Sequence, residues 1–207
     1  MPRLHSGPAL QRISRSGLWT GLALVAVLAA ACGQPAHGPS GHHASSPAAA
    51  AATPTPTRQP HVPAQLVIPK INVNAAVEQV GVDQSNNMAV PSKTTDVAWY
   101  KFGPKPGQPG DAVIDGHLDW YNGPAVFWSL SKLQAGDEID VMGQDGAKLR
   151  FQVSETQSVA YTSHPAGLFA TSGTPRLSLI TCAGSWDKNK KIYSERLIVD
   201  ATYIGEV

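Results

Sequence analysis

Short apolar segments, separated by turn-forming residues, are the feature that most constrains the fold of residues 62–207. Valine, isoleucine and leucine are concentrated in segments 66–73, 76–82, 112–117, 139–142, 148–154, 176–182 and 193–203. Glycine, proline and aspartate lie between these segments, and no long stretch repeats its apolar residues with the 3.6-residue period of an amphipathic helix. The pattern predicts an all-β fold, a barrel or a sandwich of seven or eight strands.

Local signals add detail to this prediction. Residues 139–154 have the pattern of a hairpin, with Asp145-Gly146 as the turn. Pro69 interrupts the first apolar segment, which suits an edge strand or a bulge. Residues 126–133 predict a single helical turn, and residues 165–168 a short helix or a loop. The whole segment of about 145 residues is long enough to bury a real core.

The N-terminal residues 1–32 have the features of an export signal. Three arginines precede an uncharged, mostly apolar segment that ends at Cys32. Its length of roughly 15 residues fits a signal peptide better than a membrane span, which needs about 20. In one interpretation Cys32 is the lipidated cysteine of a lipobox, and in the other it lies within an uncleaved signal anchor. Either interpretation tethers the remaining chain to the outer face of the membrane.

Residues 33–61 predict a disordered linker, because proline, alanine, glycine, serine, threonine and histidine dominate them. Four of the histidines, at positions 37, 42, 43 and 61, fall in this segment. No acidic residue or cysteine accompanies them at a fixed spacing, so we interpret them as a solvated polar tract rather than a metal site. The predicted organisation is therefore a signal or anchor at 1–32, a linker at 33–61 and a folded domain at 62–207.

Charge and cysteine content exclude several functions. The formal net charge is +1, and no basic cluster with interleaved aromatic residues is present, so we expect no nucleic-acid partner. Acidic residues number 15 and form no cluster, so we also expect no metal and no other cofactor. Of the two cysteines, Cys32 belongs to the anchor, which leaves Cys182 without a disulfide partner. A lone thiol in an oxidising compartment is expected to be either buried or reactive.

Three side chains are candidates for chemistry. Cys182 follows an apolar segment and precedes the small residues Ala183-Gly184, as would suit a thiol displayed where a strand ends. His117 likewise follows an apolar segment and can act as general acid or base near neutral pH. Arg196 lies within a third segment and offers a permanently charged donor group. Taken singly, each is also compatible with an ordinary structural role.

Neighbouring residues leave some alternatives open. Period-2 alternation puts Arg196, Ile198 and Asp200 on one face of a strand and the intervening apolar residues on the other. Asp119 could orient the imidazole of His117 or simply form a turn. His164 precedes a proline in a polar loop, and we predict that it lies at the surface.

Together, the three candidates and their surroundings resemble the sortases, which are cysteine transpeptidases of the Gram-positive cell envelope. Residues 178–182 read Ser-Leu-Ile-Thr-Cys, where the family has Thr-Leu-x-Thr-Cys, and Arg196 follows downstream. Residues 115–117 read Asp-Gly-His, which matches the family's histidine at the end of a strand. The likeness covers roughly residues 63–205. Within the family, the chain most resembles the actinobacterial class F sortases, at residues 106–114, 123–127, 133–137 and 177–184.

This resemblance implies an eight-stranded sortase-type β-barrel with short helices or helical turns in its loops. It implies that Cys182 attacks the Thr–Gly carbonyl of an LPXTG-like sorting signal on a surface protein, that His117 exchanges protons, and that Arg196 binds the substrate backbone or the oxyanion. The resulting thioacyl group would pass to a peptidoglycan-precursor amine or to water. We expect a monomer on the extracytoplasmic face of the membrane or in the cell wall.

Two other functions remain to be weighed against this one. An L,D-transpeptidase or another envelope cysteine peptidase would also place a histidine before a cysteine, but typically within Ser-x-Gly-Cys, whereas this chain has Ile180-Thr181-Cys182. A tethered lipoprotein that binds without turnover is the non-enzymatic alternative. The presence of all three reactive residues argues against it.

Overall fold

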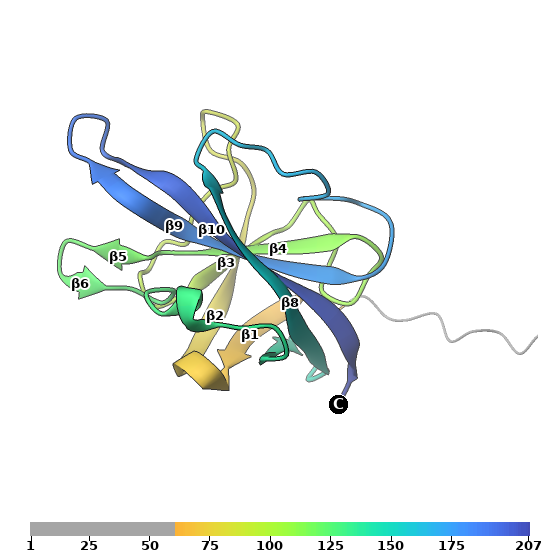
Figure 1. Ribbon diagram of the computed structural model, residues 1–207. Coiled ribbons are helices and arrows are strands. Elements are labelled where there is room, and N and C mark those ends of the chain that lie inside the picture. The colour runs from red at the N-terminus through yellow and green to blue at the C-terminus, as the bar shows by residue number, and fades with distance from the viewer. Residues whose placement is uncertain (1–60) are drawn as a thin grey trace, which may run out of the picture. The chain divides into compact units, whose positions relative to one another are not determined.

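Eight strands in the C-terminal part of the chain pair into a closed barrel (Figure 1). The computed structural model describes residues 61–207, so the predicted signal or anchor and nearly all of the predicted linker lie outside the described residues. The barrel strands are β1 (Pro63–Ile68), β2 (Val73–Val80), β3 (Val97–Tyr100), β4 (Asp111–Gly116), β7 (Glu138–Gly143), β8 (Lys148–Ala160), β9 (Arg176–Asp187) and β10 (Ile192–Glu206). The prediction of an all-β, eight-stranded barrel is confirmed.

Short elements complete the fold. Strands β5 (Asp119–Trp120) and β6 (Gly123–Pro124) form a small separate hairpin. The helical elements of the described part are the 3₁₀ turns η1 (Pro69–Ile71) and η2 (Leu130–Lys132), and neither could traverse a bilayer. The second of these turns confirms the helical turn predicted within residues 126–133.

Strand order around the barrel is β1-β2-β3-β4-β9-β10-β8-β7, and β7 closes the ring by pairing with β1. Most neighbours are antiparallel, but β2 pairs with β3 and β4 pairs with β9 in parallel. Strand β9 therefore lies between β4, which precedes it by some 60 residues, and β10, which follows it directly in the chain. This arrangement joins the three segments that carry the candidate histidine, cysteine and arginine.

Alternate residues of the strands point into the barrel and form one continuous core. In β10 the inward residues are Val199 and Ala201, 0% and 1% exposed, which confirms the face predicted from the sequence alternation. The other fully buried large side chains are Leu66, Ile68, Val97, Val113, Ile114, Phe127, Leu130, Ile139, Leu149, Phe151, Leu177 and Leu179. Phe127 and Leu130 come from the loop around η2, which therefore packs onto the core.

The first apolar segment is not the single strand that its composition suggests. Strand β1 ends at Ile68, Pro69 begins a 3₁₀ turn, and Asn72 adopts a left-handed conformation with φ of 55° before β2 starts. Proline has no backbone N–H to continue a ladder and its φ is fixed, so it ends the strand instead of forming a bulge. The prediction of an edge position is wrong, because the barrel is closed.

His61 is also placed differently from the prediction. Instead of lying in a solvated tract, its side chain is 7% exposed, and its Nδ1 lies 2.6 Å from a carboxylate oxygen of Asp145. Asp145 belongs to the turn between β7 and β8, which has the hairpin arrangement predicted for residues 139–154. His61 is thus held against the β7–β8 turn of the barrel.

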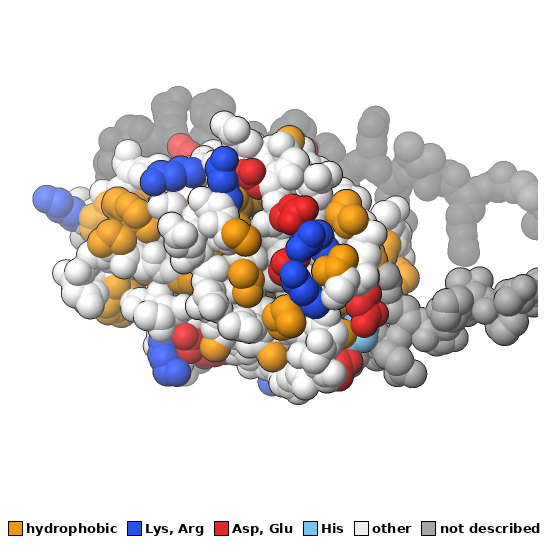
Figure 2. Space-filling model, turned by 90° about the horizontal axis from the view of Figure 1, so that it is seen from below, with side chains coloured by type: hydrophobic (Ala, Val, Ile, Leu, Met, Phe, Trp, Pro, Cys, Tyr) orange, Lys and Arg blue, Asp and Glu red, His pale blue; other side chains and the backbone are white. Residues whose placement is uncertain are grey.

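Charged side chains of both signs are mixed on the face shown in Figure 2, with small separate groups of hydrophobic side chains between them. Asp140 shows the same mixing in detail, since it pairs with Arg150 at 2.8 Å and with Lys148 at 2.8 Å. This face has no extended area of a single charge sign, in agreement with the formal net charge of +1.

A buried polar cluster ties together the three central strands. The Ser178 hydroxyl of β9 lies 2.9 and 3.0 Å from the two carboxylate oxygens of Asp111 in β4, and 2.6 Å from an oxygen of Asp200 in β10. Arg176 also approaches Asp111, at 3.3 Å. Asp111 and Ser178 are both fully buried, so this hydroxyl is the polar link across the sheet at this level.

Replacing Ser178 tests that link. We expect Ser178→Ala to lower the free energy of unfolding by about 1–3 kcal/mol, because a fully buried carboxylate loses its hydroxyl donor. Ser178→Thr keeps the hydroxyl, and we expect it to stay close to the wild type. Urea denaturation followed by tryptophan fluorescence measures both. Equal loss in the two variants would mean that packing, and not the hydroxyl, is what matters at this position.

Candidate active site

Strand register brings the three predicted residues to one end of the β4–β9–β10 sheet. Arg196 of β10 lies directly opposite Cys182 of β9, and Cα atoms of such antiparallel pairs are about 4.5–5.5 Å apart. In the parallel pair, Asp115 is level with Ile180. Because both chains continue in the same direction, His117 reaches the level of Cys182 as β4 ends.

Strand β9 continues beyond the position where the sequence suggested an end. Its pairing with β10 reaches Asp187, and the register shifts by one residue between the pairs Glu195–Ala183 and Tyr193–Trp186. That shift is a β-bulge two residues beyond Cys182, at Gly184 and Ser185, with Gly184 at φ of 77°. Bulges occur next to active sites because they redirect a side chain at a defined point. The Ala183-Gly184 pair therefore marks a bulge in a paired strand, not its end.

The imidazole of His117 is held from two sides. Its Nε2 lies 3.0 Å from the carbonyl oxygen of Pro91, and its ring packs against Trp120 with 5.3 Å between centroids. A carbonyl oxygen can only accept, so Nε2 carries the hydrogen, and Nδ1 of the neutral ring is left as the proton acceptor. The backbone is fixed as well, because the N–H of Phe127 donates to the carbonyl of His117 at 2.9 Å.

A single buried hydroxyl connects the histidine strand to the cysteine strand. Thr181, which is fully buried, donates its hydroxyl to the carbonyl oxygen of Gly116 at 2.7 Å. The two residues immediately precede Cys182 and His117. Gly116 itself has no room for a side chain, since a Cβ there would meet the ring of Phe127 at 2.5 Å. Close packing and one hydrogen bond thus set the separation of the two candidate residues.

The thiol of Cys182 is half-buried and is held in its protonated form. Burial raises its pKa above the ordinary thiol value of 9.0, the guanidinium of Arg196 lowers it, and the carboxylates of Asp115 and Asp119 raise it. Among residues 61–207 it is the one cysteine, and it is free. At neutral pH the Cys182 side chain is therefore a thiol and not a thiolate.

Arg196 is oriented by its own strand. Its Nη1 donates to the carbonyl of Glu195 at 2.8 Å and approaches that of Tyr193 at 3.4 Å. Within residues 61–207 it forms no ion pair shorter than 4.0 Å, so its charge is not neutralised by a direct carboxylate contact. A fixed, half-buried guanidinium across from the thiol can meet negative charge that develops there.

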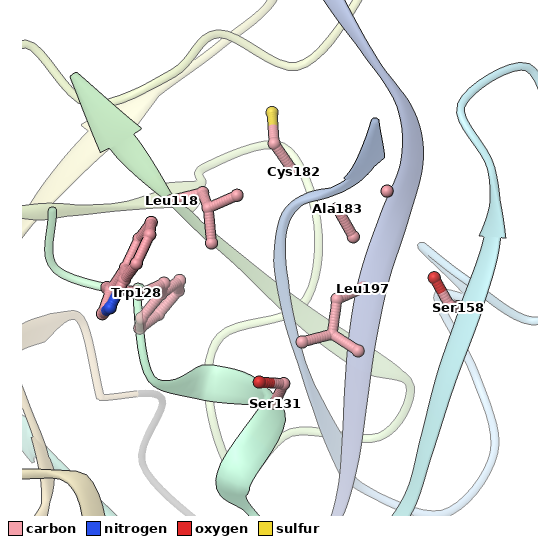
Figure 3. Close-up of a pocket in the computed structure, with 9 residues that line it drawn as sticks. Leu118, Trp128, Ser131, Ser158, Cys182, Ala183 and Leu197 are labelled. Carbon is pink, nitrogen blue, oxygen red and sulfur yellow. The ribbon is translucent and has the colours of Figure 1, made fainter. Parts of the chain in front are cut away.

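Cys182 lies between two hollows. Figure 3 shows the first, of about 450 Å³, and the sulfur at its edge points away from Leu197 and Ser131. Its walls are mostly apolar and include Leu118 and Trp128. The second hollow, of about 570 Å³, is lined by more polar side chains than the first. Its walls are His117, Leu118, Asp119, Trp120, Tyr121, Cys182, Trp186, Lys191 and Tyr193.

The second hollow lies between the β5–β6 hairpin and the end of the β9–β10 hairpin, which extend to the same side of the barrel (Figure 1). A hydrogen bond of 2.6 Å from the Tyr193 hydroxyl to Asp119 joins the two hairpins, and it raises the pKa of Tyr193 to about 12. Asp119 therefore forms its hydrogen bond with Tyr193 and not with His117, which answers the question that the sequence left open.

Sequence reasoning located the three candidate residues but not their supports. It missed Thr181, Pro91 and Tyr193, because a hydrogen bond to a distant carbonyl or carboxylate leaves no local signal. It did predict that His164 is at the surface, and that side chain is exposed. Within residues 61–207, no group of three or more histidine, cysteine, aspartate and glutamate side chains is arranged to hold a metal ion.

Comparisons with known proteins show the family and the fold of this chain. Residues 66–204 match the model of the sortase domain family. Among solved structures, the chain is similar to a lid mutant of sortase A from Corynebacterium diphtheriae, with 23% identity, a TM-score of 0.54, and 72% of this chain and 73% of that chain covered. No curated protein matches the sequence.

Two further solved structures show the same fold. The sortase C-1 of Actinomyces oris is 24% identical with a TM-score of 0.53, over 68% of this chain and 72% of that one. The lid mutant of sortase C1 from Streptococcus agalactiae is 23% identical with a TM-score of 0.54, over 69% of each chain.

Removing the charge opposite the thiol tests the electrostatics. We expect Arg196→Gln to raise the pKa of Cys182 further, because the guanidinium lowers it in the wild type. The rate of alkylation by iodoacetamide as a function of pH, in a Cys32→Ala background, measures this pKa. Arg150→Gln removes the same group from a pair with Asp140 elsewhere on the barrel and serves as the control. An unchanged or lowered pKa in Arg196→Gln would contradict the assignment.

Thr181→Val tests the link between the two strands. Valine has nearly the same shape but no donor, so we expect the free energy of unfolding to fall by about 1–3 kcal/mol. We also expect the NMR signals of the His117 ring to shift, since its strand is no longer anchored. Thr181→Ser keeps the hydroxyl and should preserve both properties. Ring signals that stay unchanged in Thr181→Val would show that the bond does not position the histidine.

Proposed function

This chain belongs to the sortase family of cysteine transpeptidases, and we propose that it cleaves an LPXTG-like sorting signal between threonine and glycine and transfers the protein to a cell-wall amine. The observation that carries this proposal is the register that sets Arg196 opposite Cys182 while β4 delivers His117 to the same level. A nucleophile, a proton carrier and a fixed positive charge are the groups that acyl transfer requires.

In the proposed mechanism Cys182 is the nucleophile. Its thiol first gives up its proton, with the free Nδ1 of His117 as the acceptor, and the sulfur attacks the threonine carbonyl carbon. The carbonyl oxygen becomes negative, and the guanidinium of Arg196 stabilises that charge. When the C–N bond breaks, the imidazolium protonates the leaving glycine amine, which leaves a thioester on Cys182.

The second half of the reaction repeats these steps in reverse. An incoming amine loses a proton to His117, its nitrogen attacks the thioester carbonyl, and the sulfur leaves and recovers its proton. Water in place of the amine gives hydrolysis. The two hollows that meet at Cys182 support a transfer reaction, because an acyl donor and an acceptor must both reach one sulfur. A protonated resting thiol also limits side reactions before a substrate arrives.

We further propose that the protein is a monomeric class F sortase on the extracytoplasmic face of a Gram-positive cell. The motifs at residues 106–114 and 123–127 support the class. The basic and apolar residues 1–32 support export, with anchoring by a lipid on Cys32 or by an uncleaved signal. Peptidoglycan precursors are the acceptors that this location would supply, and LPXTG-bearing surface proteins the donors.

The experiment that tests the function uses an LPATG-type peptide with triglycine or hydroxylamine as acceptor. We expect cleavage between threonine and glycine, a transfer product, and a thioacyl adduct on Cys182 visible by mass spectrometry. Cys182→Ala should abolish all three, and His117→Ala should slow turnover by about 10²–10⁴-fold. Cys32→Ala is the matched cysteine control and should retain turnover.

Each alternative function gives a different outcome. Binding of the peptide with no cleavage and no adduct over the whole pH range would favour a tethered binding protein. Reaction with D-amino-acid peptides but not with the LPATG-type peptide would favour an L,D-transpeptidase. Either result would contradict the proposed sorting activity.

A further inference from the structure

Asp115 carries a carboxyl group at the candidate active site, and the proposed mechanism assigns no role to it. It lies in β4, two residues before His117, and is level with Ile180 of β9. Ala112 and Ile114 of the same strand belong to the core, so Asp115 lies on the opposite face of the sheet. Asp115 is nevertheless only partly exposed. Its side chain is therefore held in the sheet beside the thiol and not at the outer surface of a loop.

Cys182 and Arg196 lie on that same face. In β9 the core residues are Leu177 and Leu179, and in β10 they are Val199 and Ala201, so the alternation puts Cys182 and Arg196 opposite the core. From β3, the residue level with Asp115 is Ala98, which carries no charge. At this end of the face, the charged and titratable neighbours of Asp115 are the guanidinium of Arg196 from β10, the thiol of Cys182 from β9 and the imidazole of His117 just beyond β4. Asp111 and Asp200 share the face but lie further along it, around Ser178.

Asp115 has unusually few partners for a carboxylate in this position. Within residues 61–207 it accepts no hydrogen bond and forms no ion pair, and the only charge that acts on it is that of Arg196. Asp111, four residues earlier on the same face, has instead both the Ser178 hydroxyl and the Arg176 guanidinium. The contrast within one strand shows that β9 supplies partners to the carboxylate of Asp111 but none to that of Asp115.

The consequence is a carboxyl group that titrates in the physiological range. Burial raises the pKa of Asp115 to about 7, and Arg196 lowers it. In turn, the ionised carboxylate raises the pKa of Cys182. Below about pH 7 Asp115 is neutral, and the thiol then feels burial, Arg196 and Asp119. Above that pH a second negative charge opposes the formation of the thiolate.

We propose that Asp115 is a positioning residue whose protonation state controls the site. When it is charged, it attracts the guanidinium of Arg196 and keeps the thiol of Cys182 protonated. When it is neutral, it does neither. The inference rests on the proposed function only where it assigns Cys182 and Arg196 to acyl transfer. A negative charge beside the thiol also opposes the formation of the oxyanion, because the guanidinium of Arg196 must then stabilise two negative groups. An unoccupied site at or above neutral pH is thereby protected against unwanted reaction of its lone thiol.

Alkylation of Cys182 by iodoacetamide tests this coupling without any peptide substrate. In a Cys32→Ala background, the logarithm of the rate for the wild type should rise with pH, flatten as Asp115 ionises near neutrality, and rise again. Asp115→Asn has the same shape but no charge, so its rate should rise without this inflection. The two proteins should agree at pH 5.5, and at pH 8 Asp115→Asn should react about three- to tenfold faster, which corresponds to roughly half to one pKa unit.

Further variants separate electrostatic from structural effects. Asp115→Glu keeps a titratable group and should retain an inflection. Arg196→Gln should move the inflection to higher pH, because the guanidinium lowers the pKa of Asp115. Asp137→Asn removes a carboxylate beside β7, which does not pair with β4, β9 or β10, and should reproduce the wild-type curve.

The results distinguish this inference from the proposed function. A wild-type rate with no inflection, or an Asp115→Asn curve parallel to it at every pH, would overturn the inference even if the peptide is cleaved. The predicted curves would support it even if no peptide is cleaved. If transpeptidation does occur, the ratio of kcat/KM for Asp115→Asn to that of the wild type should likewise rise from pH 5.5 to pH 8.

Discussion

The pairing of β9 with β4 on one side and with β10 on the other is the interaction on which the rest of the site depends. The parallel pair cannot be made by a tight turn, so the chain between β4 and β9 has to supply β7, β8 and the η2 loop before β9 can insert. Those same elements complete the barrel and contribute Phe127 and Leu130 to its core. Closing the barrel and assembling the site therefore both require β9 to lie in the same place.

Buried hydroxyl groups make this pairing specific. Ser178 connects β9 to carboxylates on both neighbouring strands, and Thr181 connects it to the carbonyl of Gly116. A shift of one residue in register would exchange the two faces of β9, which would expose its leucines and leave these buried polar groups without partners. The Ser-x-x-Thr-Cys pattern thus has a structural explanation: each hydroxyl residue fixes register, and the cysteine is delivered at a defined level.

Electrostatics at the site balance two opposing demands. Burial and two carboxylates hold Cys182 in its protonated form, whereas one guanidinium favours the thiolate. Arg196 is tied to carbonyl groups of its own strand and has no carboxylate in direct contact within residues 61–207. Its charge consequently remains available to a reaction intermediate. The half-buried Asp115 competes for that charge from β4, on the other side of β9. The protonation of this one carboxyl group can therefore alter the behaviour of the Cys182 thiol and the Arg196 guanidinium.

Sequence alone was enough for the fold class, and it proposed the three candidate residues. Alternation along residues 196–201, the Asp-Gly turn at residues 145–146 and the hydroxyl residues before Cys182 are local patterns, and local patterns follow from the period of a strand and from turn chemistry. Where such a pattern competes with distant contacts the prediction failed. Pro69 ended a strand instead of bulging it, His61 became buried against Asp145, and β9 continued past Cys182 through a bulge.

What only the tertiary structure decided is how these residues meet. The partner of His117 is a carbonyl 26 residues earlier in the chain, and that of Asp119 is a tyrosine 74 residues later. The environment of Asp115 likewise depends on Arg196, which the register of two strand pairs brings near. Composition and periodicity describe neighbours along the chain, whereas hydrogen bonds and charge interactions depend on distances in space. Those distances are fixed only when the barrel closes.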